Sequence, residues 1–176
     1  MRTLKYAILG LVSQKPMTGY DIYKEFDGPI GNFWSAKHSQ IYPELKKLTQ
    51  EKLLNYEMPE SGESLKKKVY TITEAGAKEL DAWLSEDEEL APTAKDVFRL
   101  RMYFCERMDP SLVKDLLLSQ LDKHEDKLAS LKSSMDEHYT KKPTKAQLGD
   151  YLVLSGAISR EEAYCDWIRS CLPYFK

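Results

Sequence analysis

The sequence predicts a mainly α-helical fold with one small β-hairpin, divided into two domains. Apolar residues recur at helical spacing through most of the chain, whereas residues 53–59 and 65–72 are short runs of the β-strand type. Between the two helical regions lies an acidic, aperiodic segment, 85–92, that ends in proline. We therefore expect domains at 1–84 and 93–176, joined by a linker at 85–92.

Three helices are expected before the hairpin. The first covers residues 3–14. The second ends before a loop at 27–32 and opens with Thr-Gly-Tyr-Asp at 18–21, a capping-box pattern in which the hydroxyl accepts from a free amide and the acid pairs back. The third runs from about Ser35 to Lys52. Pro43 is compatible with it if the regular helix begins near Ser39, because the first amides of a helix have no partner.

The hairpin and a fourth helix complete the N-terminal domain. The two strand segments are joined by Ser-Gly-Glu-Ser at residues 61–64, and Thr73 is placed to cap a helix that ends near Leu84. Three helices, a hairpin and a helix in this order are typical of a winged helix-turn-helix. The third helix of such a domain enters the major groove of DNA.

Composition excludes several classes of protein. With 42% hydrophobic and 31% charged residues, the chain is neither disordered nor membrane-spanning, since no apolar run approaches the ~20 residues that a bilayer requires. Its three cysteines, an odd number at irregular spacing, indicate no disulfide framework and fit a reducing cytoplasm. No zinc spacing, phosphate-binding loop or nucleophile motif occurs, so no metal, cofactor or enzymatic activity is expected.

Three blocks of the N-terminal half resemble one known family. They read GYDIYK at 19–24, SQIYPELKKL at 39–48 and VYTITEAG at 69–76, in the order and spacing of PadR-type regulators. The sequence DVFRLRMYF at 96–104 is similar to the longer PadR subgroup, which carries a C-terminal helical dimerisation domain. The resemblance implies a bacterial, homodimeric transcriptional repressor. Such a protein binds an inverted-repeat operator and is released by a small aromatic compound or by metabolic and stress cues.

Two positions depart from the usual family pattern. Lys52 stands where glycine usually ends the third helix, and a lysine at positive φ would cost about 1 kcal/mol or more. We therefore expect this helix end to be frayed or capped in another way. The hairpin reads Ser-Leu-Lys-Lys-Lys at residues 64–68, where the family often has glycine and arginine, so no bidentate arginine contact is expected there.

The winged-helix interpretation makes one set of polar residues candidates for contact with double-stranded DNA. Because the net charge is −2, affinity would have to come from residues gathered on one face. Amides can pair with adenine, and lysines can reach guanine or phosphate. The alternative for each is ordinary solvated surface, and for the tyrosine of the second helix, packing. The candidates are Ser39, Gln40, Tyr42 and Lys46 in the third helix, Tyr20 in the second, and Lys66, Lys67 and Lys68 in the hairpin.

Two long helices are expected in the C-terminal domain, one beginning at Asp109-Pro110 and one near Thr144. Each carries apolar residues at alternating steps of three and four, the spacing of a packed seam that Glu161 interrupts. Two antiparallel helices cannot bury all these side chains on each other, so we expect a second copy to cover the rest. The alternative is a monomer whose helices fold over the N-terminal domain. The candidate dimer residues are Leu117, Leu121, His124, Leu128, Leu131, Met135, Leu154, Ile158, Cys165, Ile168 and Leu172.

Four aromatic residues are candidates for an effector site between the domains. Phe98, Tyr151, Tyr164 and Trp167 could line a pocket for a small aromatic compound, although ordinary core and interface packing is the favoured explanation for them. A different functional class is a protein-interaction adaptor that uses the winged helix to bind protein. Salt separates the two classes, because DNA affinity falls steeply as salt rises whereas an apolar protein interface is insensitive to it.

Overall fold

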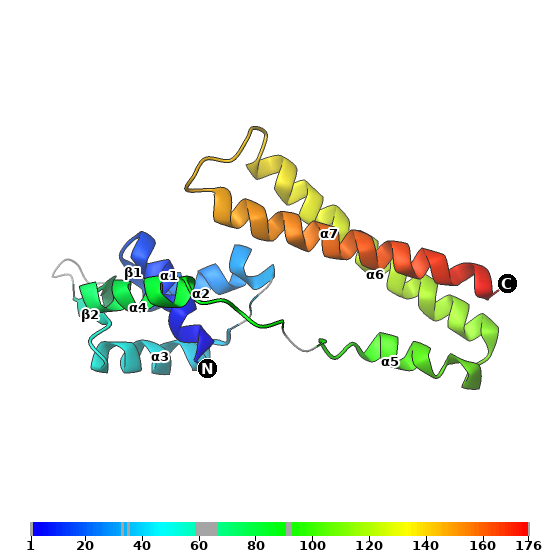
Figure 1. Cartoon of the computed structure of the whole chain (residues 1–176), viewed down its shortest axis with the longest axis horizontal. Helices are drawn as coiled ribbons and strands as arrows, with labels where there is room; N and C mark the ends of the chain where they lie inside the picture. Colours follow the sequence, from blue (N-terminus) through cyan, green and yellow to red (C-terminus); the bar gives the residue numbers. More distant parts are fainter. Residues whose placement is uncertain (1, 33, 35, 59–66, 91–92, 176) are drawn as a thin grey trace. The chain divides into compact units, whose positions relative to one another are not determined.

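The chain divides into two compact units, Met1–Glu89 and Leu90–Lys176, which are described separately (Figure 1). Both are largely helical, and the first contains a small antiparallel sheet, which confirms the expected fold class. Within the described part of the chain, no helix combines the length and apolar character that a membrane crossing requires. The residues that the computed structural model describes are 2–32, 34, 36–58, 67–90 and 93–175.

The first unit packs its helices around a sheet with strand order β1-β3-β2, in which both pairings are antiparallel. The two predicted strands are present, and a third strand, β1, pairs Met17 with Tyr70. The expected turn at 61–64 lies outside the described residues. The elements are α1 Thr3–Gln14, β1 Met17–Thr18, α2 Gly19–Asp27, a 3-10 helix Pro29–Asn32, α3 His38–Gln50, β2 Leu54–Glu57, β3 Val69–Ile72 and α4 Glu74–Leu84.

Apolar stripes on the helices and strands supply one core for the first unit. The fully buried side chains come from α1, α2, α3 and β2, so the apolar stripes determine which face of these helices turns inward. The predicted capping box of α2 is confirmed: the amide of Asp21 donates to the Thr18 hydroxyl (3.2 Å), and the amide of Thr18 donates to the Asp21 carboxylate (3.0 Å). The core includes Ile8, Leu9, Ile22, Ile41, Leu45, Leu48 and Leu54.

Helix α3 begins at His38, three residues after the expected start near Ser35 and one residue before Ser39. Its cap comes from Gln40, whose side-chain oxygen accepts from the amide of Lys37 (2.9 Å), so Ser39 lies inside the first turn. Pro43 lies within the helix and has no amide hydrogen, so it leaves the carbonyl group of Ser39 without its usual helical donor.

Helix α3 ends in a regular cap, and the expectation of a frayed end is wrong. Lys52 has φ of 60°, the left-handed conformation that favours glycine. The amide of Leu53 donates to the carbonyl of Leu48 (2.9 Å), and that of Lys52 donates to Thr49 (3.1 Å), which together form a Schellman motif. The turn is therefore closed by hydrogen bonds although a lysine occupies the strained position.

Replacing Lys52 with glycine is expected to raise the free energy of unfolding by about 0.5–1 kcal/mol, because glycine adopts positive φ without a Cβ clash. Urea denaturation followed by circular dichroism measures the change. The matched control is Lys47→Gly, an exposed position inside α3, which should lose about 1 kcal/mol. A loss of stability in both variants would contradict the left-handed assignment.

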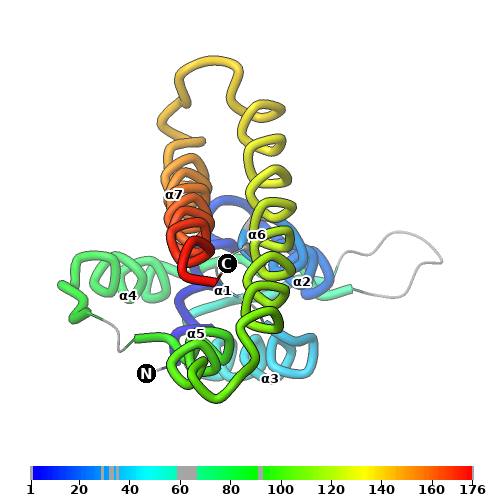
Figure 2. The backbone as a smooth tube through the Cα atoms, turned by 90° about the vertical axis from the view of Figure 1, so that its right-hand side faces the viewer, coloured from blue at the N-terminus to red at the C-terminus, as the bar shows by residue number. Residues whose placement is uncertain are grey.

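The second unit is built around two long helices, α6 and α7, which run side by side in opposite directions (Figures 1 and 2). Helix α6 begins as predicted, with Asp109 as its cap and Pro110 in the first turn. Helix α7 begins four residues after Thr144. The elements are α5 Val97–Tyr103, a 3-10 helix Cys105–Arg107, α6 Pro110–His138, α7 Leu148–Cys171 and a 3-10 helix Leu172–Tyr174.

The apolar seam predicted for a dimer packs α6 against α7 within one chain. Leu117 is only 1% exposed without any second copy. Glu161 pairs with His124 of the same chain (Oε2 to Nδ1, 2.5 Å). Of the candidate dimer residues, Leu117, Leu121, Leu131, Leu154, Cys165 and Ile168 are buried, and His124, Leu128, Met135, Ile158 and Leu172 are partly buried.

Candidate nucleic-acid interface

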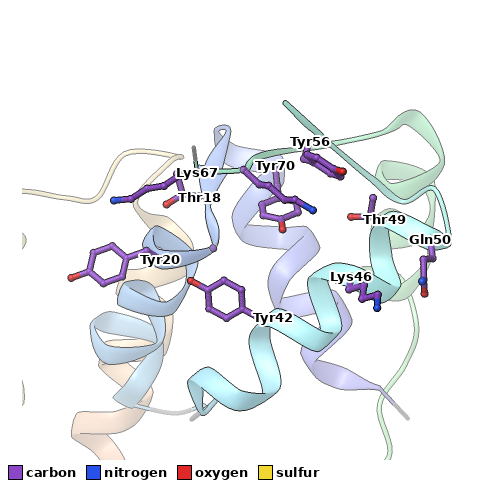
Figure 3. A pocket seen from close by; sticks show the side chains of 11 residues that line it. Thr18, Tyr20, Tyr42, Lys46, Thr49, Gln50, Tyr56, Lys67 and Tyr70 are labelled. Carbon is purple, nitrogen blue, oxygen red and sulfur yellow. The ribbon is translucent and has the colours of Figure 1, made fainter. Parts of the chain in front are cut away.

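A groove of about 710 Å³ opens on the first unit between α2, α3 and the sheet (Figure 3). Helix α3 forms one wall, the start of α2 forms another, and the sheet with the residues before β3 forms the third. Hydroxyl, amide and ammonium groups alternate with tyrosine rings around it. The lining residues are Thr18, Gly19, Tyr20, Tyr42, Lys46, Thr49, Gln50, Tyr56, Lys67, Lys68 and Tyr70.

Helix α3 presents an exposed polar face to this groove. Tyr42, Lys46 and Thr49 follow one another at steps of four and three, so they lie on one side of the helix. The fully buried Ile41 and Leu45 anchor the helix to the core by another side. The apolar stripe therefore turns the polar face of α3 outward, toward the groove.

Tyr42 occupies the centre of the groove, with its ring between α2 and α3 (Figure 3). It is 40% exposed and rests on the first turn of α2, where a Cβ on Gly19 would lie 2.9 Å from its Cε1 atom. The ring of His38 supports it at a centroid distance of 4.5 Å. Because Gly19 has no side chain, the Tyr42 ring can pack against the first turn of α2 without a steric clash.

Ammonium groups lie over the tyrosine rings at the rim. The Nζ atom of Lys68 is 3.9 Å from the ring centroid of Tyr56, and that of Lys67 is 5.8 Å from the ring centroid of Tyr20. Such cation–π contacts hold the positive charge above the ring face and leave its hydrogen-bond donors available. Lys66, the third lysine of the predicted run, lies outside the described residues.

Burial raises the pKa of Tyr70, which lies at the base of the groove. The shift strengthens the preference for the protonated hydroxyl group, which can donate a hydrogen bond. Together with the lysines, the tyrosine hydroxyl groups give the groove donors and positive charge. This combination suits the phosphate groups of a nucleic acid backbone.

Two matches to known families cover most of the chain. Residues 8–82 match the transcriptional regulator PadR-like family, and residues 94–176 match the family described as virulence activator alpha C-term. The negative transcriptional regulator PadR of Bacillus subtilis (strain 168) is 42% identical over 176 residues, with 98% of this chain and 97% of that protein covered. The chain belongs to the PadR-like family of transcriptional regulators.

Two solved structures of the Bacillus subtilis PadR closely resemble this PadR-like regulator. The complex with operator DNA is similar with a TM-score of 0.95 and 41% sequence identity, over 99% of this chain and 100% of that chain. The complex with p-coumaric acid is similar with a TM-score of 0.89 and 40% identity, over 99% of both chains. The family resemblance noted in the sequence is thereby confirmed over both units.

The structure of this PadR-like regulator gathers most of the predicted DNA-contact residues in one place. Tyr20, Tyr42, Lys46, Lys67 and Lys68 all line the groove. The other two described candidates, Ser39 and Gln40, lie in the first turn of α3 and are not among the lining residues of the groove. The side chain of Gln40 caps that helix instead. The lining residues that sequence reasoning missed are Thr18, Gly19, Thr49, Gln50, Tyr56 and Tyr70.

Helical periodicity gave a signal for part of the missed set. Thr49 and Gln50 lie one further turn along α3 from Lys46, so extending the predicted face would have included them. Tyr56 and Tyr70 are cross-strand partners in the sheet. The pairing of these two tyrosines depends on the register of the hairpin, which could not be predicted from the sequence.

Three of the four predicted effector residues meet in the second unit. The ring of Trp167 contacts those of Phe98 and Tyr164 at centroid distances of 6.2 and 5.2 Å. Tyr164 also stacks on His124 at 3.9 Å and donates its hydroxyl to Asp96 (2.7 Å). Burial and this hydrogen bond raise the pKa of Tyr164. The fourth predicted effector residue, Tyr151 in the first turn of α7, contacts a different ring, that of Tyr139.

Proposed function

We propose that this PadR-like regulator is a cytoplasmic repressor that binds an inverted-repeat operator as a homodimer. The observation that carries the proposal is the groove, where the exposed face of α3 meets lysines from the sheet side. The operator complex of the Bacillus subtilis PadR supports it, since that structure is similar over nearly the whole chain. In the proposed complex α3 enters the major groove, and the groove of the protein straddles the adjacent backbone.

The proposed roles follow from the chemistry of each side chain. Tyr42 offers a hydroxyl donor at the centre of the contact surface, and Lys46 reaches a guanine edge or a phosphate from the next turn of α3. Tyr20, Lys67 and Lys68 lie at the rim and bind phosphates. Base contacts from α3 would specify the sequence, and rim contacts would supply affinity that depends on salt.

The homodimer needs a surface other than the seam between α6 and α7, because that seam is already covered within one chain. Large apolar side chains remain exposed elsewhere on the second unit, and soluble monomers rarely leave many such groups uncovered. We propose that a second copy covers them and provides the two-fold symmetry that an inverted repeat requires. These exposed residues include Leu100, Tyr103, Phe104, Leu112, Leu118, Leu148 and Leu152.

The proposed effector is a phenolic carboxylic acid. The Bacillus subtilis PadR complex with p-coumaric acid supports this class of ligand. In this chain Phe98, Tyr164 and Trp167 present aromatic faces, and the guanidinium of Arg99 lies 6.0 Å from the Trp167 ring centroid. Aromatic faces beside a cation match a phenol ring that carries a carboxylate.

Selection of bound duplexes from a random pool, followed by salt titration of the winner, tests the proposal. A palindromic winner is expected, with affinity that falls linearly on a logarithmic salt scale and is lost when p-coumaric acid is added. Tyr42→Ala should weaken operator binding by about 1–3 kcal/mol, and each of Lys67→Ala and Lys68→Ala should reduce the salt slope by about one. The control Lys114→Ala changes an exposed lysine of α6 and should leave binding unchanged.

Two results would contradict the proposal. If no duplex is enriched, or if affinity does not depend on salt, the groove is not a DNA interface. Binding of a protein partner to the same groove, weakened by Tyr42→Ala and insensitive to salt, would favour the adaptor function instead. Retention of the operator complex in saturating p-coumaric acid would remove the effector assignment alone.

A further inference from the structure

Arg2 lies against α3, although it precedes α1 in the sequence. Its Nε (3.0 Å) and Nη2 atoms donate to Oε1 of Glu44, while Nη1 and Nη2 donate to the two carboxylate oxygens of Glu51. One guanidinium therefore bridges two carboxylates that are seven residues, about two helical turns, apart: Glu44 within α3 and Glu51 at its C-terminal cap.

The Glu44 carboxylate depends on this bridge. Glu44 is the one polar or charged residue that is buried among the described residues of the chain, with 8% of its surface exposed. A buried carboxylate is tolerated when it is paired and hydrogen-bonded, and Arg2 supplies both the charge and the donors. Hydrogen bonds from Arg2 also hold the pKa of Glu51 below its usual value, which favours the ionised form of this carboxylate.

The bridge holds α3 by the side that faces away from the DNA-contact residues. With 100° of rotation per residue, Glu44 and Glu51 lie about 20° apart around the helix axis. Tyr42 and Lys46 each lie about 160° from Glu44, one on either side of the opposite face. Because the Arg2 guanidinium binds both Glu44 and Glu51, it holds the angle at which the opposite face, with Tyr42 and Lys46, is presented.

We propose that Arg2 is a positioning residue for operator recognition. It sets the rotation of α3 through Glu44 and Glu51 and thereby places Tyr42 and Lys46 in the groove, without contacting DNA itself. A rotation of 20° moves an atom on the helix surface by about 2 Å, more than the range over which a hydrogen bond survives. This inference rests on the proposed DNA-binding function.

The planar fork of arginine is essential to the proposed role. Its donors can reach both carboxylates at once, whereas a lysine offers one compact charge and can satisfy one of them. Arg2→Lys is thus expected to keep the charge and lose the bridge. Arg2→Met keeps most of the stem and loses the charge as well.

The experiment compares a selected operator duplex with a scrambled duplex of the same length, at fixed salt and across a salt series. Arg2→Met should lower operator affinity about tenfold or more, change scrambled-duplex affinity by less than about threefold, and leave the salt slope unchanged, because no phosphate contact is lost. Arg2→Lys should fall between Arg2→Met and the native protein. The control Lys78→Met removes an exposed lysine paired with Glu74 and should change neither affinity.

A double variant tests whether Arg2 acts through its carboxylate partner. If Arg2 works through Glu44, the variant that combines Arg2→Met with Glu44→Gln should lose no more operator affinity than Arg2→Met alone. Where Arg2→Met does not fold, Glu51→Gln removes only the exposed half of the bridge, and a two- to fivefold loss confined to the operator is expected.

Three outcomes would overturn the inference. Unchanged operator affinity in Arg2→Met, or in Glu51→Gln where the first variant fails to fold, means that the bridge does not position α3. Parallel losses on both duplexes with a shallower salt slope mean that Arg2 binds phosphate directly. Additive losses in the double variant mean that Arg2 and Glu44 act independently. Failure of the native protein to bind any selected duplex would instead contradict the proposed function.

Discussion

Replacement of Leu117 with aspartate is expected to unfold the second unit. Leu117 lies in the cluster between α6 and α7 with Val113, Leu121, Cys165 and Ile168. Loss of a buried leucine side chain costs about 2–5 kcal/mol, and an unpaired carboxylate in the same place costs more. The sum is comparable with the entire stability of a typical domain, about 5–15 kcal/mol. Far-ultraviolet circular dichroism and urea denaturation measure the loss.

The neighbouring variant Leu118→Asp is the matched control, because Leu118 is on the same helix and 40% exposed. Leu118→Asp should leave the helix content and the urea midpoint of each protomer unchanged. In analytical ultracentrifugation it should shift the proposed dimer toward monomer. If Leu117→Asp gave a folded monomer while Leu118→Asp stayed dimeric, the seam would instead be the dimer interface, as its periodicity first suggested.

Gly76→Ala is expected to destabilise the first unit by about 2–3 kcal/mol, the cost of strong overpacking. A Cβ at this position would lie 2.2 Å from the carbonyl oxygen of Leu53 and 2.9 Å from Cγ1 of Ile72. The same carbonyl accepts from the amide of Thr73 (3.1 Å), so α4 cannot move away without breaking that hydrogen bond. Thermal unfolding measures the change.

Gly10→Ala provides the comparison, because among the described residues no atom beyond the adjacent backbone of α1 lies within 4 Å of the added methyl group. Alanine is the better helix former, so this variant should gain about 0.5–1 kcal/mol. Equal melting temperatures for the two alanine variants would show that the approach of α4 to Leu53 is looser than the structure indicates.

Helices of the first unit were accessible to sequence reasoning because their apolar periodicity and cap residues are local signals. The Thr18–Asp21 capping box is contained in four residues, and it formed as predicted. Strand β1 was not accessible, since two residues carry no alternation and its pairing with β3 depends on residues about fifty positions away. The closed turn at Lys52 was missed for a similar reason: the sequence showed the strain, and only the surrounding hydrogen bonds showed that it is tolerated.

The second unit shows where periodicity is ambiguous. Steps of three and four identify a face that packs against another helix, and they were read correctly in α6 and α7. The same spacing serves a helix of the same chain or of a second chain, so Leu117 and Ile168 could not be assigned to one or the other. The identity of the partner is a property of the tertiary fold.

The tyrosine rings beneath the rim lysines also affect the entropy of binding. A free lysine side chain samples many rotamers and loses up to about 2 kcal/mol of conformational entropy when it is immobilised. The Lys68 ammonium, at 3.9 Å from the Tyr56 ring centroid, has lost part of that freedom before any ligand arrives. The surface is therefore preorganised for a polyanion, and folding has already met part of the ordering cost that association would otherwise carry.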